Sequence, residues 1–436
     1  MATQNNKKEI IEKVKGMRDV LSEEYLFRKK IIEKAESIAT FYGFEPIQTP
    51  HLEKVELFTA SVGESTDIVE KEMYELKTKG GKRLVLRPEG TAPIMRAYLR
   101  HGMQNQPQPI MLYYHGSFFR HEKPQRGRQR EFQQFGIEIL GEADAITDAI
   151  VIKTLLVILE EAVGIKPISV RLNSIGDIEC RKIYQKELLA YYKNKTNELC
   201  KDCKNRMKSN PLRLLDCKNE NCEKIKQEAP QIINFLCPDC TAHFKDLLEI
   251  LDTSEISYYL DHYLVRGLDY YSRTAFEFFI EDNSEETEEG KKVLELGGGG
   301  RYDSLSKILS NKNIPGVGGA IGIDRAITVL SENKKISVAT KTPKIFFIQL
   351  GANAKYKSLV VLEMLRKAKI SVKHSLSKNS LKSQLKIAAK LEVPYVLILG
   401  QKESTDNTII IRDMKTTSQE IVPITKLTDK LKKKLK

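Results

Sequence analysis

The 436-residue sequence has no long apolar stretch. Hydrophobic residues make up 41% and charged residues 30% of it, and no segment approaches the roughly 18 uninterrupted apolar residues of a membrane-spanning helix. The start, MATQNNKKEIIEKVKG, also lacks the apolar core of a secretory signal. The composition is typical of globular chains and differs from that of disordered ones. We therefore expect a soluble, cytoplasmic protein with two or three domains.

A glycine-rich nucleotide-binding loop is also missing. The sequence has no GxxxxGK[ST] pattern, and GVGGAIGID (Gly316–Asp324) has the wrong glycine spacing for a dinucleotide fingerprint. Any nucleotide must therefore be held by side chains. In an extended strand Gly318, Ala320 and Gly322 would share one flat face, which either receives a planar base or packs closely against another segment. Arg325 follows at a strand-to-helix junction, where its guanidinium could reach a phosphate.

Positive charge is concentrated near the C-terminus. The chain carries 71 Lys and Arg and 58 Asp and Glu, of which 21 basic and 7 acidic residues lie from Lys341 onwards. The preceding 340 residues hold 50 basic and 51 acidic side chains and are close to neutral. A basic unit on a neutral body favours a polyanionic partner, nucleic acid first. The alternative is a lysine-rich solvated surface.

Patterning along the chain predicts two domains and a linker. Residues 1–331 mix helices with hairpin-like strands, which favours an antiparallel sheet flanked by helices in an α+β domain. Residues 332–343 are polar, end in proline and are predicted to be a linker. Residues 344–436 alternate strands and helices, as in a small α/β domain. We interpret the acidic run EDNSEETEEG (Glu281–Gly290) as a solvated loop.

All seven cysteines lie between about residues 176 and 252, in a stretch that is helical in pattern and rich in Lys and Asn. We interpret this stretch as a helical insertion in the first domain. Two C-x2-C pairs permit a zinc site, with two further cysteines as competing ligands. The pairs are Cys200 with Cys203 and Cys237 with Cys240, the competitors are Cys217 and Cys222, and the seventh cysteine is Cys180. Because disulfides are not expected in the cytoplasm, the alternative to zinc is a set of buried reduced thiols.

The stretch FRHEKPQRGRQREFQQFGIEILG joins a charged segment to an alternating strand. Two predicted strands, Ile110–Arg120 and Phe132–Leu140, are separated by a loop longer than the roughly two to five residues usual in hairpins. Period two places Gln134 and Glu138 on one face, on either side of Gly136. This face is either a notch for a small ligand whose amine compensates the carboxylate, or a polar, solvated surface.

Two further stretches offer polar groups that suit recognition of a small polar molecule. The first, LRPEGTAP, presents Glu89 and Thr91 around Gly90 at a helix entry, where a glutamate also simply favours the helix N-terminus. The second, LVRGLDYYSRTAFEF, places an arginine, an acid and two tyrosines beside a glycine: Arg266, Asp269, Tyr270, Tyr271 and Gly267.

Together these segments resemble the class II aminoacyl-tRNA synthetases, and in particular the bacterial type of histidyl-tRNA synthetase. KGMRDV, LRPEGTAP, FRHEKPQRGRQREFQQFGIEILG, LVRGLDYYSRTAFEF, GGRYDSL and GVGGAIGIDRAITVL occur in the family's order over nearly the whole chain. YGFEPIQTP, ending at Pro50, is similar to the first class II motif, the long hairpin to the second, and the glycine strand with Arg325 to the third. Asp324 stands where the family more often has Glu.

The resemblance implies ATP-dependent activation of L-histidine to histidyl-adenylate, with Mg²⁺, and transfer to the 3′ end of tRNA(His) by a homodimer. Arg266 and Arg120 would be catalytic. Residues around histidine would be Glu89, Gly90, Thr91, Gln134, Glu138, Tyr270, Tyr271 and Tyr302. Residues contacting ATP would be Arg120, Glu122, Arg128 and Arg325. Residues 344–436 would form the family's anticodon-binding domain.

Three alternatives stay open from the sequence. One is the synthetase-like regulatory subunit of ATP phosphoribosyltransferase, a family that generally lacks the C-terminal domain and an intact LVRGLDYY motif. Another is an RNA-binding or stress-sensing protein that keeps the fold, although such a protein has no need of three phosphate-directed arginines. The third is a sister synthetase for threonine, proline or glycine, against which Glu138, the paired tyrosines and Arg266 argue.

Overall fold

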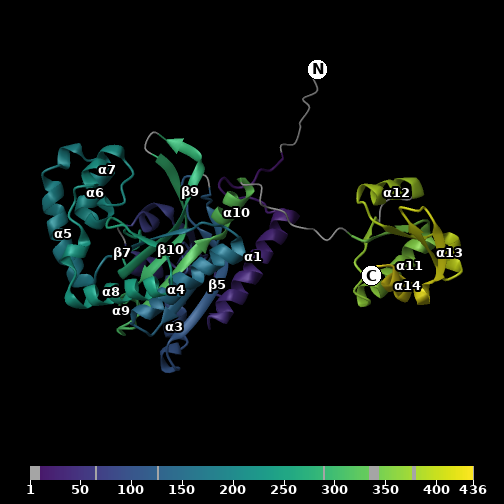
Figure 1. The fold of residues 1–436 in the computed structure, drawn as a ribbon, viewed down its shortest axis with the longest axis horizontal. Helices are drawn as coiled ribbons and strands as arrows, with labels where there is room; N and C mark the ends of the chain where they lie inside the picture. Colours follow the sequence, from purple (N-terminus) through teal and green to yellow (C-terminus); the bar gives the residue numbers. More distant parts are fainter. Residues whose placement is uncertain are drawn as a thin grey trace, which may run out of the picture. The chain divides into compact units, whose positions relative to one another are not determined.

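The chain forms two compact units, one up to residue 337 and one from residue 338, in the computed structural model of Figure 1. The structure describes residues 10–63, 66–124, 127–287, 290–332, 343–375 and 380–435. The predicted linker therefore lies outside the described residues except at its two ends. Among the described residues, no helix is long and apolar enough to cross a membrane.

An eight-stranded sheet forms the centre of the first unit. Its strands, in order across the sheet, are β1 (Glu45–Pro46), β5 (Ile110–Phe119), β6 (Glu131–Leu140), β11 (Gly316–Gly322), β10 (Gly290–Arg301), β9 (Ser272–Thr287), β7 (Ser169–Ser174) and β8 (Tyr258–Leu260). The outer pairs β1·β5 and β7·β8 are parallel, and the five pairs between them are antiparallel. The predicted α+β class with a mainly antiparallel sheet is confirmed.

One face of this sheet is covered by long helices. They are α1 (Ser22–Phe41), α4 (Ala145–Val157), which continues in the π-type turns η3 (Ile158–Val163), α8 (Pro238–Thr253) and α10 (Ile323–Glu332). Phe135, Ile137 and Ile139 of β6 point into this core and are fully buried. Because these three residues alternate with Gln134 and Glu138, the period-two assignment of Gln134 and Glu138 to the other face is confirmed. Burying each apolar side chain stabilises the sheet by roughly 1.5–3 kcal/mol.

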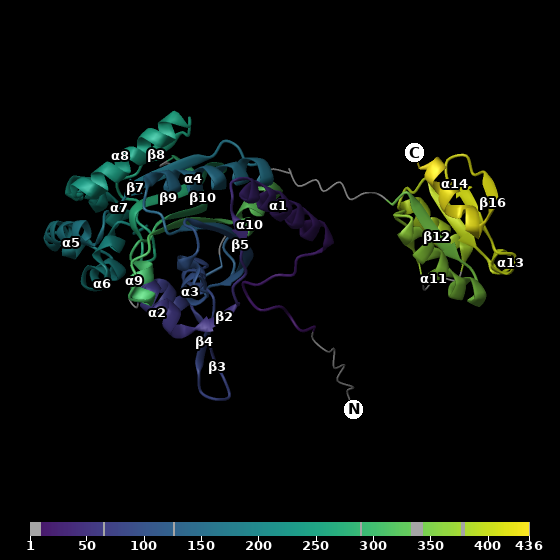
Figure 2. The same cartoon turned by 90° about the horizontal axis from the view of Figure 1, so that it is seen from below.

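Shorter elements cover the opposite face. They are α2 (Val55–Val62), α3 (Thr91–Arg100), α9 (Leu305–Leu309), the turns η1 (Ile68–Glu72) and η2 (Met103–Asn105), and a small sheet of order β2 (Leu52–Lys54), β4 (Arg83–Leu86), β3 (Tyr74–Lys77). Figure 2 shows α4 and α3 on the two sides of the large sheet. This second layer leaves part of the sheet face open, and the candidate site lies there.

Between β7 and β9 the chain forms a group of helices. It contains α5 (Ile178–Lys193), α6 (Lys201–Ser209), α7 (Glu220–Lys226) and α8, with the short turns η4 (Thr196–Glu198), η5 (Pro211–Leu214) and η6 (Ile232–Phe235). The backbone N–H of Ile175 donates to Arg273 O at 2.7 Å, and that of Arg273 donates to Gly176 O at 2.8 Å. These two hydrogen bonds hold the beginning of the helical group against the start of β9.

One loop prediction is wrong. The acidic run Glu281–Gly290 was expected to be a solvated loop, but β9 continues to Thr287 and β10 begins at Gly290. Most of the run therefore extends the β9–β10 hairpin. Backbone pairing explains the difference, because the ladder hydrogen bonds of a hairpin do not depend on apolar side chains.

The second unit is a small α/β domain, as predicted. Its sheet has the order β13 (Lys373–His374), β12 (Ile345–Gln349), β14 (Tyr395–Leu399), β15 (Thr408–Asp413), β16 (Gln419–Pro423). Strand β12 runs parallel to both of its neighbours, and the remaining pairs are antiparallel. Its helices are α11 (Ala352–Lys367), α12 (Leu381–Lys390), α13 (Gln401–Thr405) and α14 (Leu427–Lys434), with the turn η7 (Ile424–Lys426). Strands β12 and β14 are almost continuously apolar because both sheet faces carry a core.

Candidate active site

A cleft lies over the open part of the large sheet, bordered by α3, the β5–β6 hairpin, β10 and β11. Its cavity volume is about 130 Å³. Most predicted site residues line it: Glu89, Gly90, Thr91, Arg120, Glu122, Arg128, Gln134, Arg266, Tyr270, Tyr271 and Arg325. Glu138 and Tyr302 do not line it. Both are almost completely buried and bonded to each other, and Thr91, which lines the cleft, also binds Glu138.

Glu138 is a buried carboxyl held by hydroxyl groups. Tyr302 Oη donates to Oε2 at 2.5 Å, Thr91 Oγ1 donates to Oε1 at 2.8 Å, and Tyr114 Oη lies 3.3 Å from Oε1. Burial raises the pKa of Glu138 to about 8, although the bonds from Tyr302 and Thr91 favour the charged form. No Lys, Arg or His of the described residues forms an ion pair with this carboxyl. A cationic ligand would supply the missing charge.

Glu89 is bound by the N-terminus of α3. Its carboxylate accepts hydrogen bonds from the backbone N–H groups of Thr91 at 2.6 Å and Ala92 at 3.0 Å, and from Tyr270 Oη at 3.2 Å. Burial nevertheless raises the pKa of Glu89. Glu89 therefore stabilises the N-terminus of α3, as one interpretation of the sequence predicted. The same residue also lines the cleft.

The notch that we expected above Gly136 is filled by a tyrosine. Strand pairing places Tyr114 directly opposite Gly136. A Cβ at Gly136 would lie 2.3 Å from Tyr114 Cζ, and one at Gly90 would lie 2.5 Å from Tyr114 Cε2. Both glycines thus make room for one phenol ring, and the ring forms part of the cleft wall. No sequence pattern marks Tyr114 as a site residue, because it lies on the neighbouring strand at a register that the sequence does not specify.

The glycine strand β11 serves two purposes. A Cβ at Gly318 would lie only 1.6 Å from Glu138 Oε2, so this glycine admits a protein carboxyl. Ala320 and Gly322, on the same face, line the cleft. Gly318 therefore allows close packing within the protein. Ala320 and Gly322 leave a flat surface that is open to a ligand.

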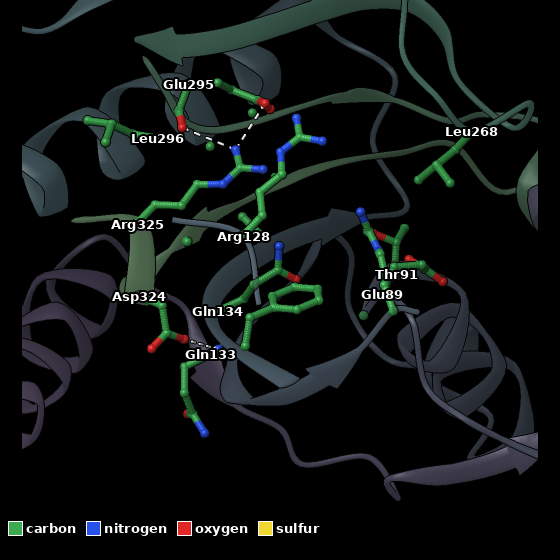
Figure 3. Close-up of a pocket in the computed structure, with 18 of the residues that line it drawn as sticks. Glu89, Thr91, Arg128, Gln133, Gln134, Leu268, Glu295, Leu296, Asp324 and Arg325 are labelled. Atoms are coloured by element: carbon green, nitrogen blue, oxygen red, sulfur yellow. Dashed lines mark hydrogen bonds and ion pairs between the residues drawn. The ribbon is translucent and has the colours of Figure 1, made fainter. Parts of the chain in front are cut away.

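Arginines gather at the other end of the cleft. Figure 3 shows Arg325 and Arg128 beside Glu295, away from Glu89 and Thr91. Arg325 Nη1 donates to Glu295 O at 3.1 Å and to Glu295 Oε2 at 3.0 Å. Arg128 Nη1 lies 3.3 Å from Glu122 Oε2. In each contact a carboxylate already compensates the guanidinium.

Arg266 is the most enclosed guanidinium of this group. Its Nη1 donates to Glu277 Oε1 at 2.5 Å and lies 3.9 Å from Glu295 Oε1. Although burial opposes the charge of Glu295, Arg325 and Arg266 lower its pKa to about 2. Burial outweighs Arg266 at Glu277 and raises its pKa to about 7. Arg266 Nε is buried and has no acceptor among the described residues, an energetically costly state that a ligand oxygen would relieve.

Arg120 connects the two ends of the cleft. Its Nε donates to Pro88 O at 2.9 Å, next to Glu89, and its Nη1 lies 3.8 Å from Glu122 Oε1. Its guanidinium also lies over the ring of Phe132 at 5.4 Å. The side chain therefore has a fixed position on the cleft wall.

Asp324 is a structural residue that sequence reasoning treated only as a departure from the family pattern. Its carboxylate accepts from the backbone N–H of Gln133 at 2.6 Å, from Arg28 Nη2 at 2.6 Å and from Arg18 Nη2 at 3.1 Å. It thereby ties β6, α1 and the KGMRDV segment to the start of α10, where Arg325 begins its reach into the cleft.

Asp269 does not line the cleft. Its Oδ1 accepts from Asn210 Nδ2 at 2.6 Å, and its backbone carbonyl accepts from Arg181 Nη1 at 3.2 Å. The residue therefore connects the helical group of residues 176–252 to the turn that carries Tyr270 and Tyr271.

The cysteines do not combine as the sequence suggested. The structure brings the first C-x2-C pair to Cys217 and Cys222, the two residues that were considered competitors. The second pair, Cys237 and Cys240, lies with Cys180 and Asp177. Of the alternatives that the sequence left open, the structure therefore favours Cys217 and Cys222 as partners of the first pair and not a single site made of both C-x2-C pairs, because the packing of short helices places the pairs in different clusters.

Known proteins resemble this chain over nearly its whole length. A family profile described as histidyl-tRNA synthetase matches residues 16–326, and one described as anticodon binding domain matches residues 344–434. A histidine–tRNA ligase of Dehalococcoides mccartyi is 42% identical over 421 residues, which cover 97% of this chain and 99% of the relative. One of Caldicellulosiruptor bescii is 40% identical over 425 residues, with 98% and 99% covered.

A solved structure supports the same relationship. The crystal structure of apo histidyl-tRNA synthetase from S. aureus aligns with a TM-score of 0.77 and 31% identity, covering 97% of this chain and 99% of that one. The family profile, the full-length relatives and this structure agree with the cleft described above. The chain belongs to the histidyl-tRNA synthetase family.

Proposed function

We propose that the chain is an active histidine–tRNA ligase. It would join L-histidine to ATP as histidyl-adenylate and then transfer the histidyl group to the 3′ end of tRNA(His). The observation that carries the proposal is a single cleft with two chemically different ends. Behind the wall of one end lies the buried carboxyl of Glu138, which has no cationic partner among the described residues, and the other end holds arginines that suit phosphate groups.

The carboxyl end would hold histidine. An ammonium or imidazole N–H placed here would hydrogen-bond to Glu89, and its positive charge would favour the ionised form of Glu138 behind the wall, while the aromatic rings would exclude water from the site. The residues that we assign to this pocket are Glu89, Gly90, Thr91, Gln134, Glu138, Tyr270, Tyr271 and Tyr302. Tyr302 and Glu138 act from just behind the cleft wall, through Thr91 and the hydrogen bond between them.

The arginine end would hold ATP. A histidine carboxylate oxygen attacks the α-phosphorus, the bond to the β-phosphate oxygen breaks, and pyrophosphate leaves. No protein nucleophile is needed, so positioned cations provide most of the acceleration. We assign Arg266 and Arg120 to the reacting α-phosphate and carboxylate, and Arg325, Arg128 and Glu122 to the rest of ATP.

Mg²⁺ would accompany ATP. The carboxylates of Glu122 and Glu295 line this end of the cleft, and they are oxygen ligands of the type that Mg²⁺ prefers. When bound, the ion would neutralise part of the phosphate charge.

We further propose a division of labour along the chain. Residues 1–331, with the insertion at about 176–252, would perform both chemical steps. Residues 344–436, joined through residues 332–343, would bind the anticodon, with phosphate contacts giving affinity and base contacts giving specificity. The positive charge of this second unit supports the assignment. By analogy with the family we expect a homodimer in the cytoplasm.

Exchange of labelled pyrophosphate into ATP tests the first step. We expect exchange that depends on histidine and does not occur with threonine, proline or glycine. Exchange with one of these amino acids in place of histidine would contradict the specificity. A complete absence of exchange would favour the regulatory subunit of ATP phosphoribosyltransferase, which the match of residues 344–434 to an anticodon-binding domain argues against.

Truncation after residue 343 tests the division of labour. The second unit has its own hydrophobic cores, so its removal should leave the first unit folded. We expect tRNA charging to fall far more than pyrophosphate exchange. Equal losses in both assays would contradict the assignment.

A further inference from the structure

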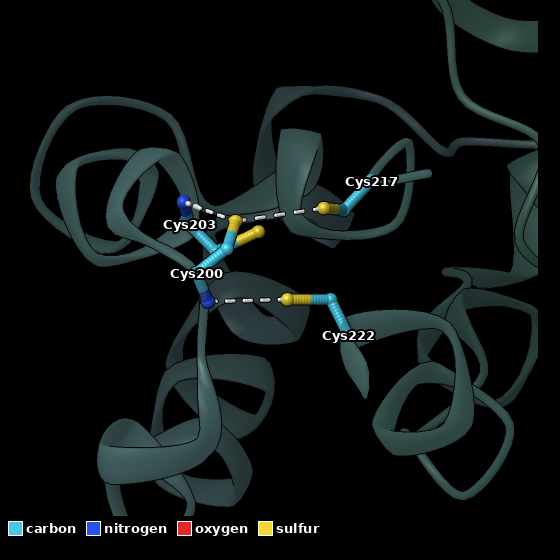
Figure 4. A group of neighbouring side chains, drawn as sticks. All are labelled: Cys200, Cys203, Cys217 and Cys222. Carbon is cyan, nitrogen blue, oxygen red and sulfur yellow. Dashed lines mark hydrogen bonds between the residues drawn. The ribbon is translucent and has the colours of Figure 1, made fainter. Parts of the chain in front are cut away.

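Four cysteine side chains converge within the helical group of residues 176–252. Figure 4 shows Cys200, Cys203, Cys217 and Cys222 directed toward a common centre. Their Sγ atoms all lie within 4.8 Å of one another, and those of Cys200 and Cys217 are 3.8 Å apart. None of the four forms a disulfide. A tetrahedral zinc site with Zn–S bonds of about 2.3 Å has sulfur–sulfur edges of about 3.8 Å, so the thiols stand at the spacing of zinc ligands.

Backbone N–H groups are already directed at the sulfur atoms. The N–H of Cys203 donates to Cys200 Sγ at 3.4 Å, and the N–H of Cys200 donates to Cys222 Sγ at 3.3 Å. Such bonds orient metal-bound thiolates and stabilise their charge. Cys200 also caps the nine-residue helix α6, whose positive end favours a thiolate at that position.

The helices around these cysteines are short. Helix α6 has nine residues, η5 four and α7 seven, and helices this short are marginal in isolation. The four cysteines come from α6, from α7 and from the turn between η5 and α7. One metal ion would therefore link these short segments directly, in addition to the hydrophobic contacts of Leu214, Leu215 and Ile225.

We propose that Cys200, Cys203, Cys217 and Cys222 bind one structural zinc ion. Binding replaces the thiol protons by Zn–S bonds and involves no change of oxidation state. The site is closed, with four protein ligands, and so is suited to structure and not to catalysis.

A second cluster of ligand atoms supports a second zinc site in the same helical group. The ligand atoms of Asp177, Cys180, Cys237 and Cys240 also lie within 4.8 Å of one another. Asp177 caps α5 and Cys237 caps α8, two helices of 16 residues each whose N-termini meet here. The N–H of Cys237 donates to Cys180 Sγ at 3.1 Å, and that of Cys240 donates to Cys237 Sγ at 3.4 Å. This site would hold zinc by three sulfur atoms and one carboxylate.

The first site also borders the reaction cleft. Cys217 and its neighbours line a wider cleft that they share with Arg120 and Arg266. In the same segment, Arg213 Nη2 lies 2.7 Å from Asp67 Oδ2. The zinc ion would therefore fix the shape of this segment, which the ion pair of Arg213 and Asp67 attaches to the rest of the first unit.

Metal analysis tests both sites without reference to activity. The full-length protein is produced in zinc-supplemented medium and purified without chelator, and zinc per chain is measured by mass spectrometry. We expect two zinc ions per chain in the unaltered protein, one in Cys217→Ser and one in Cys240→Ser. Asn219→Ala is the matched control, because Asn219 caps α7 next to Cys222 but is not a ligand, and it should keep both ions.

Cobalt titration covers the case in which a serine variant fails to fold. The chelator-treated unaltered protein is titrated with Co²⁺, and thiolate-to-cobalt absorption should appear for two ions in tetrahedral coordination. A zinc content far below one ion per chain without cobalt absorption would overturn both sites, as would iron or a disulfide at these cysteines. Zinc that survives Cys217→Ser unchanged would overturn the first site, and zinc that survives Cys240→Ser would overturn the second. These outcomes do not depend on whether the chain ligates histidine to tRNA.

Discussion

Glu138 and Arg325 belong to opposite ends of the same cleft, and their surroundings differ in kind. Glu138 is completely buried, and among the described residues its carboxyl is hydrogen-bonded by the hydroxyl groups of Tyr302, Thr91 and Tyr114. The side chain of Arg325 is 23% exposed and is paired with Glu295. At the carboxyl end a cationic ligand would therefore stabilise the ionised form of Glu138, whereas the arginine end is already compensated by protein carboxylates.

The two ends of the cleft would therefore have different tasks. The carboxyl end would select the ligand, and the arginine end would support the reaction with ATP. A buried carboxyl without a partner favours a cationic ligand strongly, because the ligand replaces hydration that burial has removed. Arginines that are held by Glu277, Glu295 and Glu122 would keep their geometry before ATP arrives, and under the proposed function phosphate oxygens would then compete with these carboxylates. Substitutions at the carboxyl end should thus alter histidine binding, and those at the arginine end should alter the rate.

Arg266→Ala should have the largest effect. Loss of a charge-stabilising contact in the transition state lowers kcat by roughly 10²-fold or more, and we expect such a loss in histidine-dependent pyrophosphate exchange. Arg83→Ala is the matched control, since Arg83 is exposed and pairs with Glu75 far from the cleft lining. An Arg266→Ala rate near that of the unaltered protein would refute the catalytic role.

Glu138→Gln should act mainly on histidine binding. Removing the charged partner of a hydrogen bond costs about 1.5–3 kcal/mol, so the KM for histidine should rise about 10- to 100-fold, with a smaller change in the KM for ATP. Steady-state exchange kinetics with each substrate varied in turn measure both constants. Glu75→Gln removes an exposed carboxylate and should leave both unchanged. A larger effect on ATP than on histidine would contradict the assignment of the two ends.

Tyr302→Phe should have a smaller effect in the same direction. The variant removes one hydroxyl that stabilises the charged form of Glu138, so the pKa of this carboxyl should rise further above about 8. The KM for histidine should increase roughly tenfold or less, and its minimum should move to higher pH. A pH profile identical to that of the unaltered protein would show that Tyr302 does not act through Glu138.

The smallest effect concerns stability without ligand. The pKa of Glu138 rises from 4.5 to about 8 on folding. Between these values the folded state binds a proton that the unfolded state has lost, so this group makes the free energy of unfolding fall as pH rises. The melting temperature of Glu138→Gln should therefore decline less between pH 5 and pH 8 than that of the unaltered protein. A steeper decline in the variant would contradict the raised pKa.

Much of the fold could be predicted because its signals are local. The alternation in Phe132–Leu140 identified the buried face of β6, and the strands and helices of residues 344–436 followed from short apolar patterns. The acidic hairpin arm could not be predicted in this way, because backbone pairing with β10 forms it and no apolar pattern marks it.

The residues of the candidate site also fall into two groups, those that the sequence identifies and those that only the structure reveals. Motif residues such as Glu89, Arg266 and Arg325 could be named from the sequence, and the structure places them in one cleft. Tyr114 and the role of Asp324 could not, because one depends on the register of β5 with β6 and the other on contacts across almost the whole first unit.

The sequence by itself determined the family, the two folded units and the residue types around the cleft. Only the tertiary structure decided that Tyr114 fills the space above Gly136 and that Cys200 and Cys203 meet Cys217 and Cys222, not Cys237 and Cys240. The physical reason is the range of the interactions. Patterns within one strand or helix depend on neighbouring residues, whereas strand register and the packing of short helices depend on contacts between residues far apart in the chain.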